Sequence, residues 1–308
     1  MRVVTILLAL VLAAPAYAGE NGPFTVRASG KSYWRLGQAV SAIGNGDGAI
    51  DIAPGRYRDC AVQEAGRIAY IGTQPGAVIF DGMACEGKAT LVLRGRAAHV
   101  QGITFAHVTV PDGNGAGIRL ERGNLDVTES QFIDSQSGIL SADDPSSAIR
   151  VDKSTFAGLG TCPGGDCAHS IYIGNYGSLS VTNSRFERGT GGHYVKSRAT
   201  RIVVLNSSFD DTRGRATNYM IDLSGGAVGR IAGNTFVQGR NKDNHAAFIT
   251  VAPEGVANPS QGLIVEDNTG SIAPGAPWSS VFVADWSHEP LVIRNNKLGK
   301  GLTVSEQF

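Results

Sequence analysis

The sequence predicts an all-β protein, a right-handed parallel β-helix whose N-terminal end is capped by a short helix. Two observations lead to this prediction. A short polar residue stands two positions before an aromatic one at intervals of 23 to 34 residues, and strands with alternating apolar positions lie between these marks. A pattern that recurs every ~20 to 50 residues is typical of solenoids in which each repeat forms one coil.

The marks of this repeat begin after residue 100. They are Ser130 and Phe132, Ser154 and Phe156, Ser184 and Phe186, Ser207 and Phe209, and Asn234 and Phe236. Phe105 precedes the series with Ile103 in the polar position, and Asn268 and Asn296 continue it with Gly270 and Leu298 in the aromatic position. We expect the phenylalanines to stack inside the solenoid and the polar residues to form a ladder at one corner. An up-and-down β-barrel is the alternative, but it would show hairpin turns and closely spaced strands.

The N-terminal segment has the pattern of a cap. Residues 31–44 place Leu36, Ala39, Val40 and Ile43 at helical spacing, and residues 49–59 alternate as a strand that ends in a Pro-Gly turn. A solenoid needs a cap because its first coil would otherwise expose an apolar end. We predict a single β-helix domain from residue 23 to residue 308.

Residues 1–18 have the pattern of a cleavable signal peptide. Arg2 precedes an apolar run from Val3 to Ala14, and small residues lead to an expected cleavage after Ala18. We therefore expect a periplasmic or secreted protein. No later apolar run approaches the ~20 residues that a membrane helix needs, so we expect no membrane span.

Charge and cysteine content narrow the expected partners and environment. The 27 acidic and 27 basic residues balance, which gives no indication of nucleic acid as a partner, and we expect a monomer. The four cysteines are even in number, and in an exported chain this favours disulfides, Cys60 with Cys85 and Cys162 with Cys167. A zinc site is the alternative, but the paired C-x-x-C spacing of structural zinc sites is missing from the sequence.

Titratable residues are densest in residues 191–211. Aligning residues 169–174, 193–198 and 220–225 as neighbouring strands, with Ile173, Val195 and Leu223 inside, predicts an outward column of Tyr172, Tyr194 and Asp222. Equivalent positions on adjacent coils lie about 4.8 Å apart. Lys196 and Arg198 then project onto the same face, with His169, Asn218 and His245 near the strand starts. Such residues also occur on β-helix faces that only contact solvent, and His193 has an inward alternative.

This group of side chains suits β-elimination on a uronic-acid polysaccharide. The reaction removes a proton next to a carboxylate, so the carboxylate charge must be offset and the enolate-like intermediate stabilised. Like charge from Arg198 and His193 is expected to lower the pKa of Lys196 and to make it the base. Tyr172 or Tyr194 is expected to protonate the leaving oxygen, and Arg198 to bind the substrate carboxylate.

The segment GGHYVKSRATRIVVLNSSF resembles the catalytic coil of the family-six polysaccharide lyases, the group of alginate lyase and chondroitinase B. The resemblance implies Lys196 as the base. In that family the acid arginine comes from a following coil, for which Arg213 and Arg215 are the positional candidates. Calcium as a cofactor is implied by the resemblance alone, and the sequence assigns no metal ligands. The whole chain is similar to the pectate-lyase-like superfamily of exported β-helix proteins.

Three other functions use this fold. A polygalacturonase is disfavoured because Asp210 and Asp211 follow His193, whereas in that family the aspartate pair precedes the histidine. A uronate C5-epimerase shares the first proton abstraction and stays an alternative. A non-catalytic polysaccharide-binding or adhesion protein is the third, although Tyr33, Trp34, Trp278 and Trp286 are scattered along the sequence.

Overall fold

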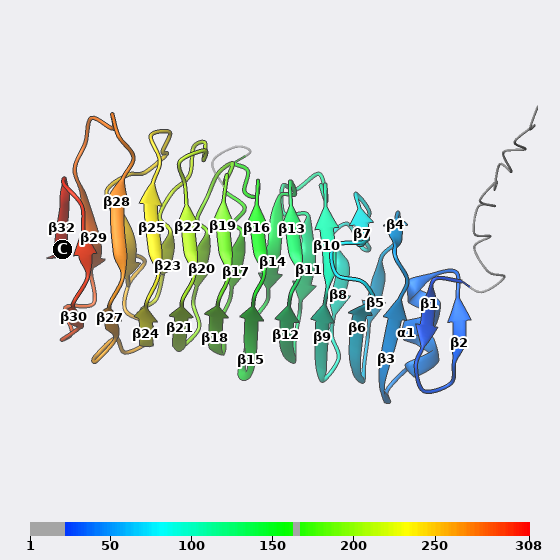
Figure 1. Ribbon diagram of the computed structural model, residues 1–308. Coiled ribbons are helices and arrows are strands. Elements are labelled where there is room, and N and C mark those ends of the chain that lie inside the picture. The colour runs from blue at the N-terminus through cyan, green and yellow to red at the C-terminus, as the bar shows by residue number, and fades with distance from the viewer. Residues whose placement is uncertain (1–21, 163–166) are drawn as a thin grey trace, which may run out of the picture.

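The computed structural model describes residues 22–162 and 167–308, and Figure 1 shows an elongated solenoid wound around one axis. The predicted signal peptide lies outside the described residues. Three parallel sheets run along the axis, and each coil contributes one strand to each sheet. The predicted right-handed parallel β-helix is confirmed. Within the described part of the chain, no helix is long and apolar enough to cross a membrane.

The first sheet carries the N-terminal end of the solenoid. It begins with two antiparallel pairings, β1 with β2 and β1 with β3, and is parallel from β3 onward. Its strands, in spatial order, are β2 (Lys31–Tyr33), β1 (Phe24–Val26), β3 (Asp47–Ile52), β6 (Arg67–Gly72), β9 (Ala97–Gln101), β12 (Asn124–Thr128), β15 (Asp144–Asp152), β18 (Tyr176–Thr182), β21 (Arg201–Leu205), β24 (Val228–Ala232), β27 (Ile264–Glu266) and β30 (Val292–Arg294).

The second sheet carries the aromatic marks of the repeat. Its strands are short because each ends at a corner of the coil. They are β4 (Gly55–Tyr57), β7 (Val78–Asp81), β10 (Ile103–Ala106), β13 (Gln131–Ile133), β16 (Thr155–Ala157), β19 (Arg185–Glu187), β22 (Ser208–Asp210), β25 (Thr235–Gln238), β28 (Thr269–Ile272) and β31 (Lys297–Leu298).

The third sheet carries the candidate site on its outer face. Its strands are β5 (Ala61–Gln63), β8 (Ala89–Leu93), β11 (Ala116–Leu120), β14 (Ser137–Ser141), β17 (Ile171–Ile173), β20 (Val195–Ser197), β23 (Ile221–Leu223), β26 (Ala247–Val251), β29 (Ser280–Asp285) and β32 (Leu302–Gln307).

The N-terminal cap is shorter than predicted. Helix α1 (Leu36–Ile43) buries Leu36, Ala39 and Val40 at the blue end of the solenoid in Figure 1. Residues 31–33, which we expected to join the helix, form strand β2 and pair with β1. The helix ends at Gly44, whose φ of 60° suits a residue without a Cβ atom.

The interior repeats as predicted. From Phe80 to Phe236, one phenylalanine per coil stacks on the next, with ring centroids 4.7 to 6.1 Å apart. The polar residue before each aromatic accepts a hydrogen bond from the backbone N–H of the equivalent residue one coil earlier. This ladder runs from Ser130 to Asn296 at 2.9 to 3.3 Å. It satisfies buried backbone groups that the corner would otherwise leave unpaired.

The cysteines pair as predicted. Cys60 is bonded to Cys85 and Cys162 to Cys167. The first bridge joins the segment before β5 to the segment before β8, and the second closes a short loop ahead of β17. Such bonds persist in oxidising compartments.

Candidate functional site

A cleft of about 610 Å³ lies against the outer face of the third sheet. It brings together residues from β11, β14, β17 and β20, from the loops that lead into β11, β17, β20, β23 and β26, and from the end of β20. They are Asn114, Arg119, Leu140, Cys167, His169, Tyr172, Gly192, His193, Lys196, Arg198, Asn218 and Asp243.

The floor of the cleft is an outward column on successive coils. Strand pairing places Arg119, Leu140, Tyr172, Lys196, Asp222 and Thr250 in register. The predicted column had Tyr194 between Tyr172 and Asp222, which is wrong, because Lys196 occupies that position. Val195 pairs with Ile171 and Ile221, so the predicted register was shifted by two residues.

Tyr194 faces the interior instead of the cleft. It precedes β20 at a corner where the chain bends, and its side chain is 1% exposed. Its ring meets the edges of Phe186 and Phe209 at 6.3 and 6.4 Å, and its hydroxyl donates to Asp211 Oδ1 at 2.6 Å. Burial and the Asp211 carboxylate raise the pKa of Tyr194 well above its usual range. The expected contact of Tyr194 with substrate is therefore wrong.

Lys196 lies between two carboxylates. Its Nζ is 2.5 Å from Glu254 Oε1 and 3.2 Å from Asp222 Oδ2. Burial alone would lower the pKa of Lys196, but the two carboxylates outweigh burial and raise it. The expectation that like charge lowers this pKa is therefore wrong, and Lys196 is an ammonium ion at neutral pH.

Asp222 is held in place by two further donors. Its Oδ2 accepts from the Ser224 hydroxyl and its Oδ1 accepts from the Thr250 hydroxyl, each at 2.9 Å. The side chain is buried in β23, directly beside Lys196 in the column. Asp222 therefore anchors the lysine from below instead of standing free in the cleft.

Arg198 joins the same network from the end of β20. Its Nη2 is 2.6 Å from Glu254 Oε2, and its Nε donates to the Tyr172 hydroxyl oxygen at 3.1 Å. Burial lowers the pKa of Arg198, but Tyr172 and Glu254 raise it more. Lys196 and Arg198 also lie near the Tyr172 ring, 5.9 and 5.7 Å from its centroid. The two cations thus share the Glu254 carboxylate and lie over the Tyr172 ring, and Arg198 also contacts the phenol oxygen.

Three stacked rings lie at one side of the cleft, and two of them, those of His169 and His193, line it. His193 lies between His169 and Tyr219, at centroid distances of 5.0 and 5.4 Å. Burial, followed by the charge of Lys196, lowers the pKa of His193 to about 3. Burial and the neighbouring His193 likewise hold the pKa of His169 well below its usual range. Both imidazoles are therefore neutral at pH 7.

A hydrogen bond between the two histidines indicates the tautomer of His169. His169 Nδ1 accepts the backbone N–H of His193 at 2.9 Å, so the proton of His169 is on Nε2. His193 Nε2 lies 3.5 Å from Asp222 Oδ2. Within the described ranges, no partner reaches the buried Nδ1 of His193. His193 lines the cleft, so the alternative in which its side chain points into the core is wrong.

The structure places three predicted substrate-binding residues elsewhere. Arg213 is exposed and lies 3.9 Å from Glu187 of β19 in the second sheet. The backbone N–H of Arg215 donates to the Gly189 carbonyl oxygen at 2.8 Å, and its side chain is exposed. His245 stacks on Trp278 at 4.4 Å. These positions contradict their predicted place at the site: Asn218 and Asp243 of the same loops line the cleft, whereas Arg213, Arg215 and His245 do not.

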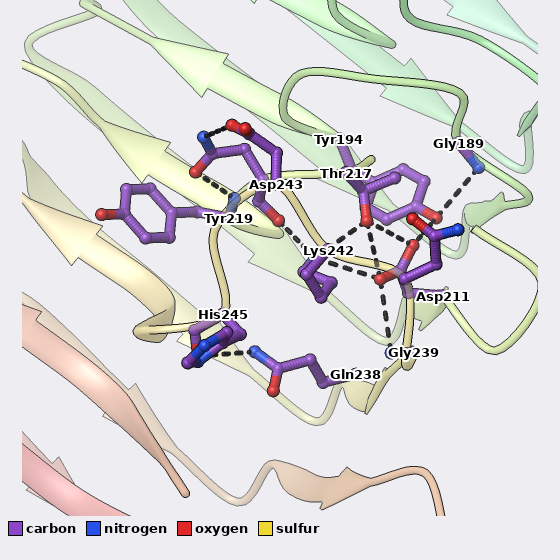
Figure 2. A network of polar contacts seen from close by, with 12 residues as sticks. Gly189, Tyr194, Asp211, Thr217, Tyr219, Gln238, Gly239, Lys242, Asp243 and His245 are labelled. Carbon is purple, nitrogen blue, oxygen red and sulfur yellow. Dashed lines mark hydrogen bonds and ion pairs between the residues drawn. The ribbon is translucent and has the colours of Figure 1, made fainter. Parts of the chain in front are cut away.

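Sequence reasoning missed Glu254, Arg119 and a buried ion pair. Glu254 follows β26 and lies 58 residues from Lys196 in the sequence. The buried pair is Lys242 and Asp211, drawn in Figure 2 below Thr217. Outward register in the third sheet would have indicated Arg119, which shares a column with Lys196, but no local pattern points to the other residues.

The residues of the cleft do not fit a calcium site. In residues 22–162 and 167–308, no three side chains of His, Cys, Asp or Glu converge in an arrangement that could hold a metal ion. The carboxylates nearest to the cleft floor, Asp222 and Glu254, are already bound to Lys196 and Arg198. A calcium ion requires several oxygen ligands together. We therefore derive no step that involves calcium.

Comparison with known proteins supports the fold. The family described as "Right handed beta helix region" matches residues 91–269, more than half of the chain. No curated protein matches the sequence significantly.

Two solved structures are distantly similar to this chain. The PL6 family alginate lyase AlyGC is 15% identical with a TM-score of 0.49, over 83% of this chain and 40% of the lyase. ORF18 of Geobacillus virus E2 is 12% identical with a TM-score of 0.41, over 88% of this chain and 57% of that protein. This chain thus spans about half the length of either, and likenesses this low carry no inference of activity.

Proposed function

The chain belongs to the family of right-handed β-helix regions, and we propose that it is a polysaccharide lyase that cleaves a uronic-acid polysaccharide by β-elimination. One observation carries this proposal. Lys196 Nζ and Arg198 Nη2 bind the two oxygens of a single carboxylate, that of Glu254, at 2.5 and 2.6 Å. The two cations therefore form a fork of the right dimensions for a carboxylate at the floor of an open cleft.

The fork supplies what the first step of the reaction requires. When a uronate carboxylate takes the place of the Glu254 carboxylate, the positive charges of Lys196 and Arg198 offset its charge. They then stabilise the enolate-like intermediate formed when the neighbouring proton leaves. Glu254 can yield this position because its side chain is 42% exposed and follows β26 in a surface turn.

Tyr172 is the proton-transfer residue in this proposal. Its hydroxyl oxygen accepts a hydrogen bond from Arg198 Nε at 3.1 Å, which holds the phenol beside the fork. The role of base, expected for Lys196, passes to Tyr172 because the raised pKa of Lys196 keeps it protonated. The neutral His169, with its proton on Nε2, is a donor for the polymer.

The reaction balances without a co-reactant. The C5–H bond and the bond from C4 to the glycosidic oxygen break, a C4–C5 double bond forms, and the proton ends on the leaving oxygen. The product is an unsaturated uronate that absorbs ultraviolet light.

The test is an ultraviolet assay of the purified protein against alginate, pectate, glucuronan and glycosaminoglycans. We expect at least one polymer to yield the unsaturated product. Tyr172→Phe should then lower kcat by about 100- to 10,000-fold, the usual contribution of a positioned acid or base. Tyr33→Phe and Arg201→Met, which lie outside the cleft, are the matched controls. Full activity of Tyr172→Phe would contradict its role.

The same experiment separates the alternatives. A C5-epimerase would incorporate solvent deuterium into the polymer without an unsaturated product or a change in chain length. A binding protein would retard one of the polymers in an affinity gel and change none of them chemically. Either outcome would overturn the lyase proposal.

A further inference from the structure

A buried polar network, drawn in Figure 2, lies behind three residues that line the cleft. These residues, which we call the cleft wall, are His193, Asn218 and Asp243. Lys242 Nζ is 3.0 Å from Asp211 Oδ2, 3.0 Å from Thr217 Oγ1 and 2.5 Å from the Asn218 carbonyl oxygen. The Lys242 side chain is 1% exposed and that of Asp211 is fully buried. None of these four groups takes part in the reaction proposed above.

The Asp211 carboxylate is surrounded by hydrogen-bond donors. It accepts from the Tyr194 hydroxyl at 2.6 Å, from the Thr217 hydroxyl at 2.8 Å and from the Gly239 backbone N–H at 3.3 Å. A Cβ atom at Gly214 or at Gly239 would overlap Asp211 itself. Both oxygens of the carboxylate therefore have hydrogen-bond donors within the protein. The backbone at Gly214 and Gly239 lies so close to Asp211 that neither position has space for a side chain.

The network joins three loops that build the cleft wall. Gly192, Thr217 and Lys242 form bridges from one coil to the next, in the loops that connect the second sheet to the third. In each loop the residue that follows the bridge lines the cleft, and these residues are His193, Asn218 and Asp243.

Hydrogen bonds connect the wall residues as well. The N–H of Asn218 donates to the Gly192 carbonyl oxygen at 2.7 Å, and the N–H of Asp243 donates to that of Thr217 at 2.9 Å. The Asn218 side chain donates to Asp243 Oδ2 at 3.0 Å. The wall is thus one layer of side chains with the ion pair directly behind it.

Stability alone does not account for this pair. Removing two charges from water is costly, and apolar residues of similar volume often stabilise a protein as well or better. We propose that the Lys242–Asp211 pair is a positioning unit, which holds His193, Asn218 and Asp243 in register along the cleft. Its role in catalysis rests on the proposed function, whereas its effect on the wall does not.

The charge of Lys242 also reaches the wall. Burial is the largest cause that lowers the pKa of His193, and the charges of Lys196 and Lys242 add to it. The other groups around this imidazole are the rings of His169 and Tyr219 and the carboxylates of Asp222 and Glu254. Removing Lys242 should therefore raise the pKa of His193, while burial still holds it below the usual value.

The experiment compares the wild type with Asp211→Leu/Lys242→Met, which replaces the pair by apolar side chains of similar size. Circular dichroism and a denaturation curve establish that the variant is folded. Hydrogen exchange then follows the amides of Asn218 and Asp243, and NMR follows the titration of His193. We expect at least tenfold faster exchange at both amides and a higher pKa of His193. Val204 and Val251, in β21 and β26, provide the reference amides.

A folded double variant with unchanged exchange and an unchanged His193 titration would overturn the proposal. Thr217→Val covers the case in which the double variant does not fold, because it removes only the hydroxyl that contacts both Lys242 and Asp211. It should give faster exchange at the same two amides to a smaller extent, and unchanged exchange would also overturn the proposal.

These measurements need no substrate, so they distinguish the two proposals. Faster exchange in a protein without lyase activity would refute the function and keep the positioning role. If the lyase is active and the wall amides do not respond, the positioning role fails and the function stands. In an active enzyme, we further expect kcat to fall more than KM rises, because the fork that binds the carboxylate is intact.

Discussion

Two lysine–aspartate pairs on neighbouring coils differ in the pKa of their lysine, which is raised in one pair and lowered in the other. Lys196 pairs with Asp222 at the floor of an open cleft, and Lys242 pairs with Asp211 in the buried network behind its wall. Burial lowers the pKa of both lysines. Asp222 and Glu254 together reverse this effect at Lys196, so its pKa is raised, whereas Asp211 does not reverse it at Lys242, whose pKa is lowered.

Two differences accompany these opposite directions: Lys196 contacts a second carboxylate, that of Glu254, and Lys242 is the more completely buried of the two lysines. Glu254 reaches Lys196 because the cleft is open and the turn after β26 folds over it. Asp211 is enclosed by the side chains of Tyr194, Thr217 and Lys242, and a Cβ atom at Gly214 or Gly239 would overlap it. Lys196 is therefore suited to exchange the Glu254 carboxylate for that of a ligand, whereas the buried pair of Lys242 and Asp211 is suited to keep its geometry.

Breaking the buried pair should have the largest effect on stability. Asp211→Leu alone leaves the Lys242 charge buried without its partner and should lower the free energy of unfolding by about 3–5 kcal/mol. The double variant Asp211→Leu/Lys242→Met should recover most of this loss. Chemical denaturation of the single and double variants measures both values. A single variant as stable as the wild type would contradict the claim that Lys242 is left as a buried charge without a partner.

Removing the open lysine should act on catalysis instead. Lys196→Met deletes half of the fork that offsets the substrate carboxylate and should lower kcat by about 100- to 1,000-fold, the usual effect of losing one such donor. Lys297→Met, on exposed strand β31, is the matched control and should behave like the wild type. Equal activity of the two variants would exclude Lys196 from the reaction.

Acid should weaken the cleft wall. The pKa of His193 is about 3 in the folded protein and about 6.5 in the unfolded chain. As the pH falls from about 6.5 to 3, the unfolded chain takes up the proton first, so stability is lost across this window. Denaturation midpoints between pH 7 and 4 should fall less in His193→Asn than in the wild type. His288→Asn, at an exposed position, should follow the wild type.

The smallest effect on stability is expected at Glu254. Because its side chain is 42% exposed, Glu254→Gln should change the free energy of unfolding by about 1 kcal/mol or less. In the proposed reaction, the same change frees the fork for the substrate and should lower KM. An unchanged or higher KM would show that the substrate does not compete with Glu254.

Much of the scaffold could be predicted from local spacing. A phenylalanine two positions after a Ser or Asn sets both the inward stack and the ladder, because alternation along a strand decides which side chains face inward. Cys60 with Cys85 and Cys162 with Cys167 could be paired for a similar reason, since each pair lies within about one coil. The dense run from His193 to Arg198 also led to the cleft.

The contents of the site could not be read in the same way. Tyr194 breaks the alternation because it stands at a corner just before a three-residue strand, where the chain turns its side chain inward. His245 was assigned from its nearness to a strand start, and Arg213 and Arg215 from the family resemblance. The same loops do reach the cleft, but through Asn218 and Asp243.

The sequence by itself determined the coil, its period, its aromatic interior and its disulfides, because these depend on contacts between equivalent positions of adjacent repeats. Only the tertiary structure decided which charges meet. Glu254 is 58 residues from Lys196, and Lys242 is 31 residues from Asp211, and both distances cross loops of unequal length. Strand register after each loop determines which side chains become neighbours, and that register is set by packing of the whole coil.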